Sequence, residues 1–227
     1  MSVWSSLETI VAAIQSGGAQ VVDRLVQMVL SRPEGTNRVG FTVAMIALSA
    51  KMAKADGVVT TDEVLAFRDL FHVPPGEERN VIRLFNLAQQ DVAGFETYAK
   101  KLADLFPYDR KTLLDILDGL FYIAKADGVV HQDEISYLAR VAEVFGLDDR
   151  EFSRVLARHV RENSDPYEVL GIGPDASDED LKTKYRSEVR DTHPDRLIAR
   201  GVPEEFVQIA NDRLVALNAA WAQICAE

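Results

Sequence analysis

The chain has 227 residues, of which 47% are hydrophobic and 27% charged, a composition typical of an ordered soluble protein with room for more than one domain. Its formal net charge of −11 argues against general affinity for nucleic acid or anionic lipid, so any basic recognition surface must be local. The single cysteine, Cys225, cannot form an internal disulfide, which fits a reducing compartment. We therefore expect a cytoplasmic protein, free or peripheral at the membrane, without a nucleic-acid partner.

The N-terminal segment, residues 1–33, contains two apolar stretches at 3–14 and 21–30, separated by a Gly-Gly pair. Charged residues interrupt these stretches at Glu8, Asp23 and Arg24. No run therefore reaches the roughly 20 apolar residues that a membrane span needs. No Lys or Arg precedes the first stretch, which disfavours a signal peptide. We predict amphipathic helices without a membrane span. Packing on the rest of the chain is favoured, and lying on a membrane surface is the alternative.

A pattern of Ala-Lys-Ala-Asp-Gly-Val-Val-x-x-Asp-Glu occurs twice, at residues 53–63 and 124–134, so that Asp56 and Asp127 lie 71 residues apart. Each copy follows an apolar stretch (41–52 and 113–123) and precedes an amphipathic one (64–71 and 135–145). Similarity at a fixed offset indicates a repeated structural unit, here a helix, an Asp-Gly turn and a second helix. Two such hairpins, with helices from residues 80–101 between them, predict an all-α bundle.

The repeated turn has a structural explanation. Gly57 and Gly128 occupy the position at which a helix end favours a left-handed residue. Thr60 and Glu63 have the spacing of a capping box for the next helix. In the second copy His131 replaces the threonine, and we expect it to be a weaker cap.

Metal binding is the functional alternative for the same turns. Their carboxylates are hard oxygen donors that suit Ca²⁺ or Mg²⁺, and they are Asp56, Asp62, Glu63, Asp127, Asp133 and Glu134. The alternating ligands of an EF-hand are absent. Over roughly residues 35–160 the repeats resemble the TerB family of tellurite resistance proteins. This resemblance implies a helical fold in which acidic residues are proposed to hold a divalent cation. We favour helix capping as the only role of these acidic residues and expect the protein to require no cofactor. A Ca²⁺ or Mg²⁺ site is the alternative.

A polar stretch at 161–164 precedes a differently organised C-terminal module. Asp165 and Pro166 have the residue types of a helix N-cap and first position, and Ser177 is placed to cap a second helix. In that second helix the buried stripe at i, i+4 and i+8 is Leu181, Tyr185 and Val189. Cations occupy its other faces at Lys182, Lys184, Arg186 and Arg190.

This second helix must end before Pro194, because a residue that precedes proline is disfavoured in the α conformation. His193 and Asp195 are therefore expected in a loop. A third helix comes next, with core residues at helical spacing: Phe206, Ile209, Ala210, Leu214, Leu217, Trp221 and Ile224. The module is predicted to be an antiparallel helix pair with the loop at one end.

Residues 191–196 read Asp-Thr-His-Pro-Asp-Arg and lie between two amphipathic helices. Upstream, residues 165–171 read Asp-Pro-Tyr-Glu-Val-Leu-Gly. In this combination, about residues 165–227 resemble the J domain of the DnaJ co-chaperones. The resemblance implies docking on a DnaK-type chaperone and stimulation of its ATP hydrolysis. The positions carried over as partner-binding residues are Lys182, Tyr185, Arg186, Arg190, His193, Pro194, Asp195 and Arg196. A locally basic helix on an acidic protein can also steer towards a complementary acidic patch.

The module departs from the J-domain pattern at Lys184 and Glu188, where small or apolar residues are more usual, and at Asp191, which adds negative charge beside the loop. These departures bear on affinity or partner choice. The chain has no Gly/Phe-rich linker and no Cys-x-x-Cys repeats. A TerB-like region followed by a J domain resembles the DjlA group, which usually has a membrane-spanning N-terminus. The charged first segment does not match that feature, so we do not transfer the anchor.

Taken together, the sequence predicts an N-terminal amphipathic segment at 1–33, a TerB-like domain at 34–160 and a J domain at 161–227. The leading hypothesis is a co-chaperone whose TerB-like domain serves targeting, client binding or sensing. The alternative is a divalent-cation-responsive stress adaptor. An enzyme is not expected, because His193 and Asp195 flank a proline without a nucleophile–base geometry, and nothing places Ser187 beside them.

Overall fold

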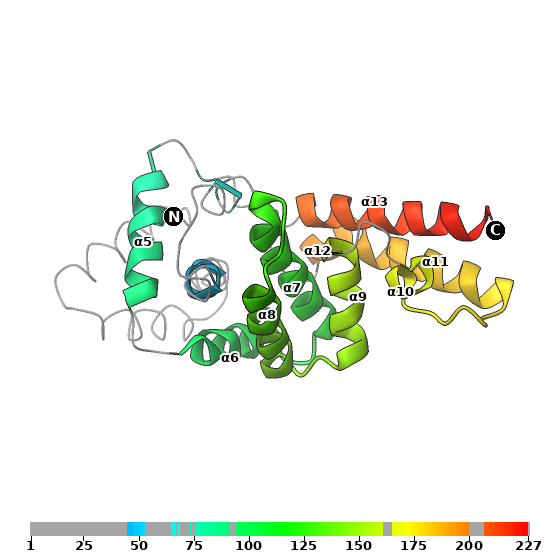
Figure 1. Ribbon diagram of the computed structural model, residues 1–227, viewed down its shortest axis with the longest axis horizontal. Helices are drawn as coiled ribbons and strands as arrows, with labels where there is room; N and C mark the ends of the chain where they lie inside the picture. The colour runs from blue at the N-terminus through cyan, green and yellow to red at the C-terminus, as the bar shows by residue number, and fades with distance from the viewer. Residues whose placement is uncertain are drawn as a thin grey trace.

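The structure is a computed structural model that describes residues 45–52, 65–66, 68, 73, 76–90, 94–160, 165–199 and 207–226. The segment 1–33 and the first Asp-Gly turn, with the amphipathic helices and the cap predicted there, lie outside these residues. Every regular element in the described part of the chain is a helix, which confirms the all-α prediction. In Figure 1, α5 (Glu78–Gln90) lies at one end of the described helices and the C-terminal helices lie at the other.

Residues 45–52 are helical and precede the labelled elements. After α5, the first part of the chain contains α6 (Phe95–Leu105), α7 (Arg110–Ala124), the 3₁₀ turn η1 (Lys125–Asp127), α8 (Gln132–Val144) and α9 (Asp149–Val160). The C-terminal module contains α10 (Pro166–Leu170), α11 (Asp178–Thr192), α12 (Pro194–Ala199) and α13 (Val207–Ile224). The helices expected between the two repeats are therefore present as α5 and α6.

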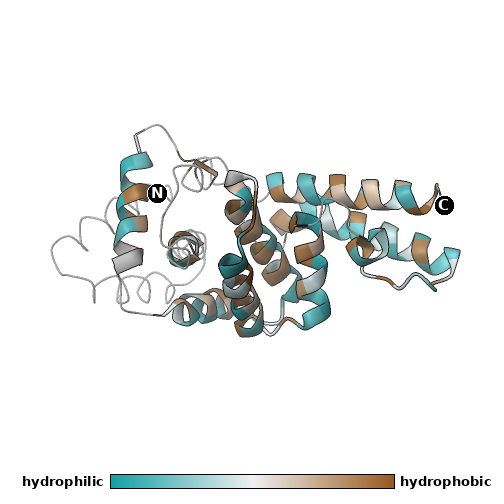
Figure 2. Cartoon of the chain, in the orientation of Figure 1, coloured by the Kyte–Doolittle hydropathy of each residue, from teal (hydrophilic) through white to brown (hydrophobic). Residues whose placement is uncertain are grey.

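Helix α7 is the centre of the described structure, because it contacts α8, α9 and α13 and is buried over most of its length. Asp109 caps its first turn, and the side chain of Asp109 accepts a hydrogen bond from the Thr112 N–H at 3.1 Å. Figure 2 shows hydrophobic colours on α7 and its neighbouring helices, and also along α13. A helix that is apolar on nearly all sides must be surrounded by other helices. The two carboxylates that α7 buries, Asp115 and Asp118, therefore need partners.

The second copy of the repeat forms the predicted helix–turn–helix. Gly128 ends η1 in the left-handed region at φ 97°, as predicted for a residue at a helix end. His131 is the N-cap of α8, and its backbone N–H donates to Glu134 Oε2 at 2.8 Å. Glu134 therefore satisfies one of the backbone donors that a helix start leaves without an intrahelical partner.

The hydrophobic core crosses the junction between the two parts of the chain. Leu197, Ile209 and Ala210 of the C-terminal module belong to the same buried cluster as α5 to α9. In the other direction, Ala157 of α9 belongs to the small cluster formed by α10 and α13. Burying one aliphatic side chain contributes roughly 1.5–3 kcal/mol. The two parts therefore pack on each other through apolar side chains as well as through the charges described below.

The C-terminal module begins with the predicted caps. The Asp165 side chain accepts from the Tyr167 N–H at 2.9 Å, and Ser177 Oγ accepts from the Asp180 N–H at 3.2 Å. Gly171 ends α10 at φ 71°, and a Cβ there would approach the Arg154 side chain to 2.7 Å. The left-handed backbone favours glycine at this position, and the Arg154 side chain packs over it.

Helices α11 and α13 lie side by side, as Figure 1 shows at the C-terminal end of the molecule. The rings of Tyr185 and Trp221 stack at 4.7 Å, and Tyr185 Oη donates to Asn218 Oδ1 at 2.8 Å. Further along α11, Glu188 pairs with Arg213. Because higher residue numbers on α11 meet lower ones on α13, the two helices are antiparallel, as the sequence predicts.

The His-Pro-Asp segment differs from the loop that we expect. Helix α11 does end before Pro194, with His193 as its C-cap, but Pro194 at once begins α12. The backbone N–H of Arg196 donates to the His193 carbonyl at 2.9 Å, which closes the first turn. Proline ends the preceding helix and also suits the first position of a new one, since its φ is already helical and it lacks the N–H that would have no partner there. The segment is a helix–helix junction.

Candidate docking surface and the contact between the two domains

The His-Pro-Asp junction presents two polar side chains to solvent. His193 is 57% exposed and Asp195 is 88% exposed. His193 Nδ1 accepts from the Asp195 N–H at 3.3 Å. On either side of the junction, Thr192 and Leu197 are buried. The backbone is thus anchored by buried neighbours, while the imidazole and the carboxylate remain available to a partner.

A basic face lies next to the junction. Lys182, Arg186 and Arg190 are all exposed, and their spacing of four residues places them on one face of α11. Arg196, in the first part of α12, is also exposed and pairs with Asp191 at 3.0 Å. The structure therefore brings the predicted cations to the helix that leads into the junction. We call Lys182, Arg186, Arg190, His193, Asp195 and Arg196 the docking surface.

The other two predicted positions are less exposed. Tyr185 is half-buried, and both its ring and its hydroxyl are engaged by α13. Its contacts in this chain hold α11 against α13. Pro194 is half-buried and determines the geometry of the junction as the first residue of α12.

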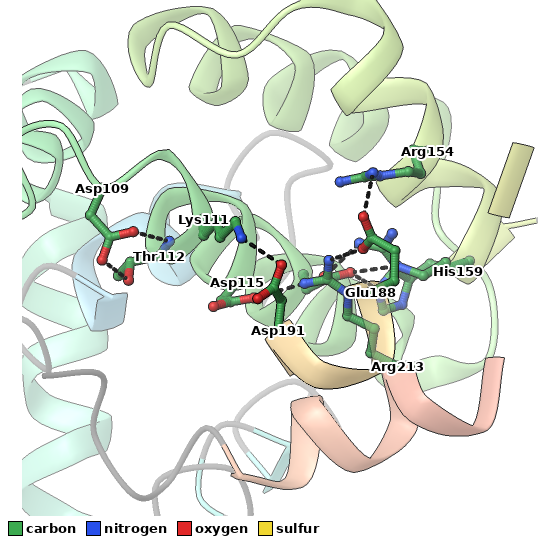
Figure 3. A network of polar contacts seen from close by, with 11 residues as sticks. Asp109, Lys111, Thr112, Asp115, Arg154, His159, Glu188, Asp191 and Arg213 are labelled. Atoms are coloured by element: carbon green, nitrogen blue, oxygen red, sulfur yellow. Dashed lines mark hydrogen bonds and ion pairs between the residues drawn. The ribbon is translucent and has the colours of Figure 1, made fainter. Parts of the chain in front are cut away.

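A buried cluster of charges joins the two domains, and the sequence patterns did not predict it. Arg213 of α13 is its centre: Nη1 lies 2.8 Å from Asp115 Oδ1 on α7, and Nη2 lies 3.2 Å from Glu188 Oε2 on α11. Figure 3 shows the Arg213 guanidinium directed towards both carboxylates. One arginine of the C-terminal module is therefore held by α7 of the first domain.

The contacts of Glu188 account for two of the departures from the J-domain pattern, Lys184 and Glu188 itself. Besides Arg213, it accepts from Arg154 of α9 at 3.3 Å and from Lys184 at 2.7 Å. Burial alone would raise the pKa of Glu188, but Arg154 and Arg213 outweigh this effect and hold it below its usual range. Glu188 therefore takes part directly in the contact with the TerB-like domain, and Lys184 binds the same carboxylate from within α11.

Asp118 is the most deeply buried carboxylate of the cluster, at 2% exposure. Its two oxygens accept from Arg158 at 3.2 and 2.6 Å, and His159 Nε2 lies 3.0 Å away. Arg213 Nη1 is within 3.7 Å. Burial would raise the pKa of Asp118, yet Arg158, followed by His159 and Arg213, holds it well below the usual range. The carboxylate is therefore ionised and bound on several sides.

The signal that could have revealed this cluster is the pair of aspartates inside the apolar stretch 113–123. A buried carboxylate is costly unless it is paired, so Asp115 and Asp118 predict cationic partners. The periodicity of α7 does not indicate which cations these are. Arg213 is 98 residues from Asp115 in the sequence, and only the packing of the two domains brings them together.

We expect this cluster to make the protein sensitive to acid. The folded-state pKa values of Asp118 and Glu188 lie below their ordinary values, so their contribution to stability is fully present above about pH 5 and is lost as the pH falls through about 4 and below. The free energy of unfolding, measured by urea denaturation, should therefore decrease over that range. A Glu188→Gln variant should show a shallower decrease. An unchanged slope would mean that Glu188 does not contribute.

Only two of the six predicted cation ligands, Asp133 and Glu134, have described side chains. Asp56, Asp62 and Glu63 lie outside the described residues, as does the side chain of Asp127. Asp133 is exposed, and Glu134 is buried and accepts the cap hydrogen bond at the start of α8. Within the described part of the chain, no three His, Cys, Asp or Glu side chains form a group suited to a metal ion. A Ca²⁺ or Mg²⁺ site stays a prediction.

Two family models match successive parts of the chain. The family model of tellurite resistance protein TerB matches residues 42–157, and the DnaJ domain model matches residues 165–213. The chain belongs to the TerB family and carries a DnaJ domain C-terminal to the TerB region.

Its curated relatives combine high coverage with modest identity. Co-chaperone protein DjlA of Photobacterium profundum is 28% identical over 84% of this chain and 81% of its own length. Co-chaperone protein DjlA of Coxiella burnetii is 26% identical over 76% of this chain and 72% of its own length. No solved structure shows a significant match. Among the described residues, no helix has the length and hydrophobicity that crossing a membrane requires.

Proposed function

We propose that this protein is a co-chaperone whose J domain docks on a DnaK-type chaperone and stimulates its ATP hydrolysis. The observation that carries the proposal is the docking surface: an exposed His193 and Asp195 on an anchored junction, next to a face of exposed cations on α11. The DnaJ domain match and the relatives named as co-chaperones support the same function. A local basic face on a chain of net charge −11 suits a partner with an acidic patch.

We propose that the TerB-like domain acts as the module for targeting, client binding or sensing. Its contacts with the J domain through Arg213 and Glu188 support a role in which it carries the J domain as one unit. Glu188 lies on the side of α11 that pairs with α9 and α13, whereas Lys182, Arg186 and Arg190 stay exposed. The docking surface is therefore open while the two domains are in contact.

The proposal is tested by the steady-state ATPase activity of the DnaK-type chaperone from the same cell, with and without the full chain. We expect the rate to rise with the concentration of this protein and then to saturate. Saturation reports a defined complex. A chaperone rate that stays at its basal value throughout the titration would refute the proposal.

Charge reversal on α11 should slow the association of the two proteins. We expect Lys182→Glu or Arg186→Glu to lower the association rate constant roughly five- to tenfold at low salt, because exposed charges act mainly by steering the encounter. Raised salt should reduce the difference, since the Debye length shortens to about 3 Å at 1 M. Stopped-flow mixing measures this constant. The control is Lys100→Glu, an exposed lysine on α6 that should leave the rate near that of the wild type. Equal rates for all three variants would contradict steering by α11.

A further inference from the structure

Helix α7 of the TerB-like domain reaches the last turn of α11, immediately before the His-Pro-Asp junction. Lys111 Nζ, in the first turn of α7, lies 2.5 Å from Asp191 Oδ2. The other carboxylate oxygen, Oδ1, pairs with Arg196 at 3.0 Å, so Asp191 is held between the two domains. The Ser187 hydroxyl also donates to Oδ2, at 3.5 Å. Asp191 is two residues from His193, and its position therefore bears directly on the junction.

Asp191 places a negative charge where docking needs a positive field. Lys111 is the first cause of the lowered pKa of Asp191, and Arg196 and Arg190 act in the same direction. Without Lys111, the charged residues of the stretch 190–196 are two arginines, Arg190 and Arg196, and two carboxylates, Asp191 and Asp195. With Lys111, the cations outnumber the carboxylates. The TerB-like domain thus supplies a charge that the J domain lacks at this point.

We propose that Lys111 is a positioning residue for docking: it binds Asp191, neutralises it and fixes the last turn of α11, so that the TerB-like domain completes the surface that the chaperone recognises. This inference rests on the proposed function and names a residue outside the J domain that contributes to it. Lys111 acts through Asp191 and does not itself contact the chaperone. The partner chemistry is an acidic protein surface, the same one that Arg186 and Arg190 face.

The stability of the chain should not depend on this contact. The Lys111 side chain is 58% exposed, and an ion pair in solvent contributes about 0–1 kcal/mol. Lys111→Ala can therefore be compared with the wild type at equal folding, which the thermal midpoint verifies. Lys100→Ala is the matched control, an exposed lysine on α6 of the same domain.

The experiment is a titration of the chaperone ATPase with the full chain, carrying Lys111→Ala, Asp191→Asn or both substitutions. We expect Lys111→Ala to raise the half-saturating concentration roughly two- to fivefold while the maximal rate stays unchanged, because charge near the contact alters association more than the stimulated step. In the Asp191→Asn background the same substitution should have little effect, since no carboxylate remains to neutralise. Lys100→Ala should match the wild type.

Each other outcome overturns the inference. A Lys111→Ala variant that titrates like the wild type would show that the bridge is irrelevant to docking. A lower half-saturating concentration would show that the bridge hinders docking. An effect that is undiminished in the Asp191→Asn background would show that Lys111 acts on its own. If the wild type stimulates the chaperone ATPase and Lys111→Ala has the same half-saturating concentration, only this inference fails. If the wild type does not stimulate, the proposed function fails and this inference falls with it.

Discussion

His193→Gln and Asp195→Asn should each abolish stimulation of the DnaK-type ATPase while leaving the thermal midpoint of this protein nearly unchanged. Both side chains are mostly exposed, and exposed substitutions usually change stability by less than about 0.5 kcal/mol. In the complex the same groups make polar contacts, and each buried group left without its partner costs about 1–3 kcal/mol. A small effect on folding and a large effect on the partner's activity are thus expected from one substitution.

The matched control for this experiment is Asp104→Asn, which makes the same chemical change at an exposed position of α6. Its ATPase titration should coincide with that of the wild type. If His193→Gln unfolds the protein, the imidazole has a structural role, and the assignment of the junction as a docking element is wrong. If the His193→Gln variant folds and still stimulates the ATPase fully, His193 is not part of the docking surface, and the proposal fails at its central residue.

Asp118→Ala should have the largest effect on stability, lowering the free energy of unfolding by about 3–5 kcal/mol. The substitution leaves Arg158, which is 3% exposed, without the carboxylate that binds its Nε and Nη2. It also removes the acceptor for His159 and a charge near Arg213. An unpaired buried charge costs far more than the loss of an exposed pair. Urea denaturation followed by circular dichroism measures the change.

Asp104→Ala supplies the reference for this measurement, because it removes an exposed carboxylate from α6 and should change the free energy of unfolding by less than about 0.5 kcal/mol. A second variant, Asp118→Asn, retains the volume and part of the hydrogen bonding, so it should fall between the alanine variant and the wild type. If Asp118→Ala is as stable as Asp104→Ala, the buried cluster does not stabilise the chain.

Local features of the chain can be predicted from the sequence because they depend on neighbouring residues. The caps at Asp165 and Ser177 form as predicted, and Gly128 adopts the left-handed conformation expected of a helix end. The prediction that α11 ends before Pro194 is also confirmed. The start of α12 at the same proline was missed, since the restriction that proline imposes acts on the residue before it and leaves the residues after it free to form a helix.

The contact between the domains depends on residues far apart in the chain, and for that reason pattern alone did not predict it. Glu188 and Asp191 stand out in the sequence only as departures from the J-domain pattern. The structure shows that they pair with Arg154 and Lys111 of the TerB-like domain. A departure from a family pattern at a surface helix can thus mark an intramolecular interface, and charge complementarity between the two domains is the signal to examine.

The most direct test of the docking surface is a single-turnover measurement, in which ATP is bound to the DnaK-type chaperone before this protein is added. Hydrolysis is then measured without interference from product release. If the surface around His193 and Asp195 acts as we propose, the full chain accelerates hydrolysis of the bound ATP, and the folded Asp195→Asn variant leaves the chaperone at its intrinsic rate. Equal hydrolysis rates with the wild type, with Asp195→Asn and with no added protein would contradict the proposed role of this surface.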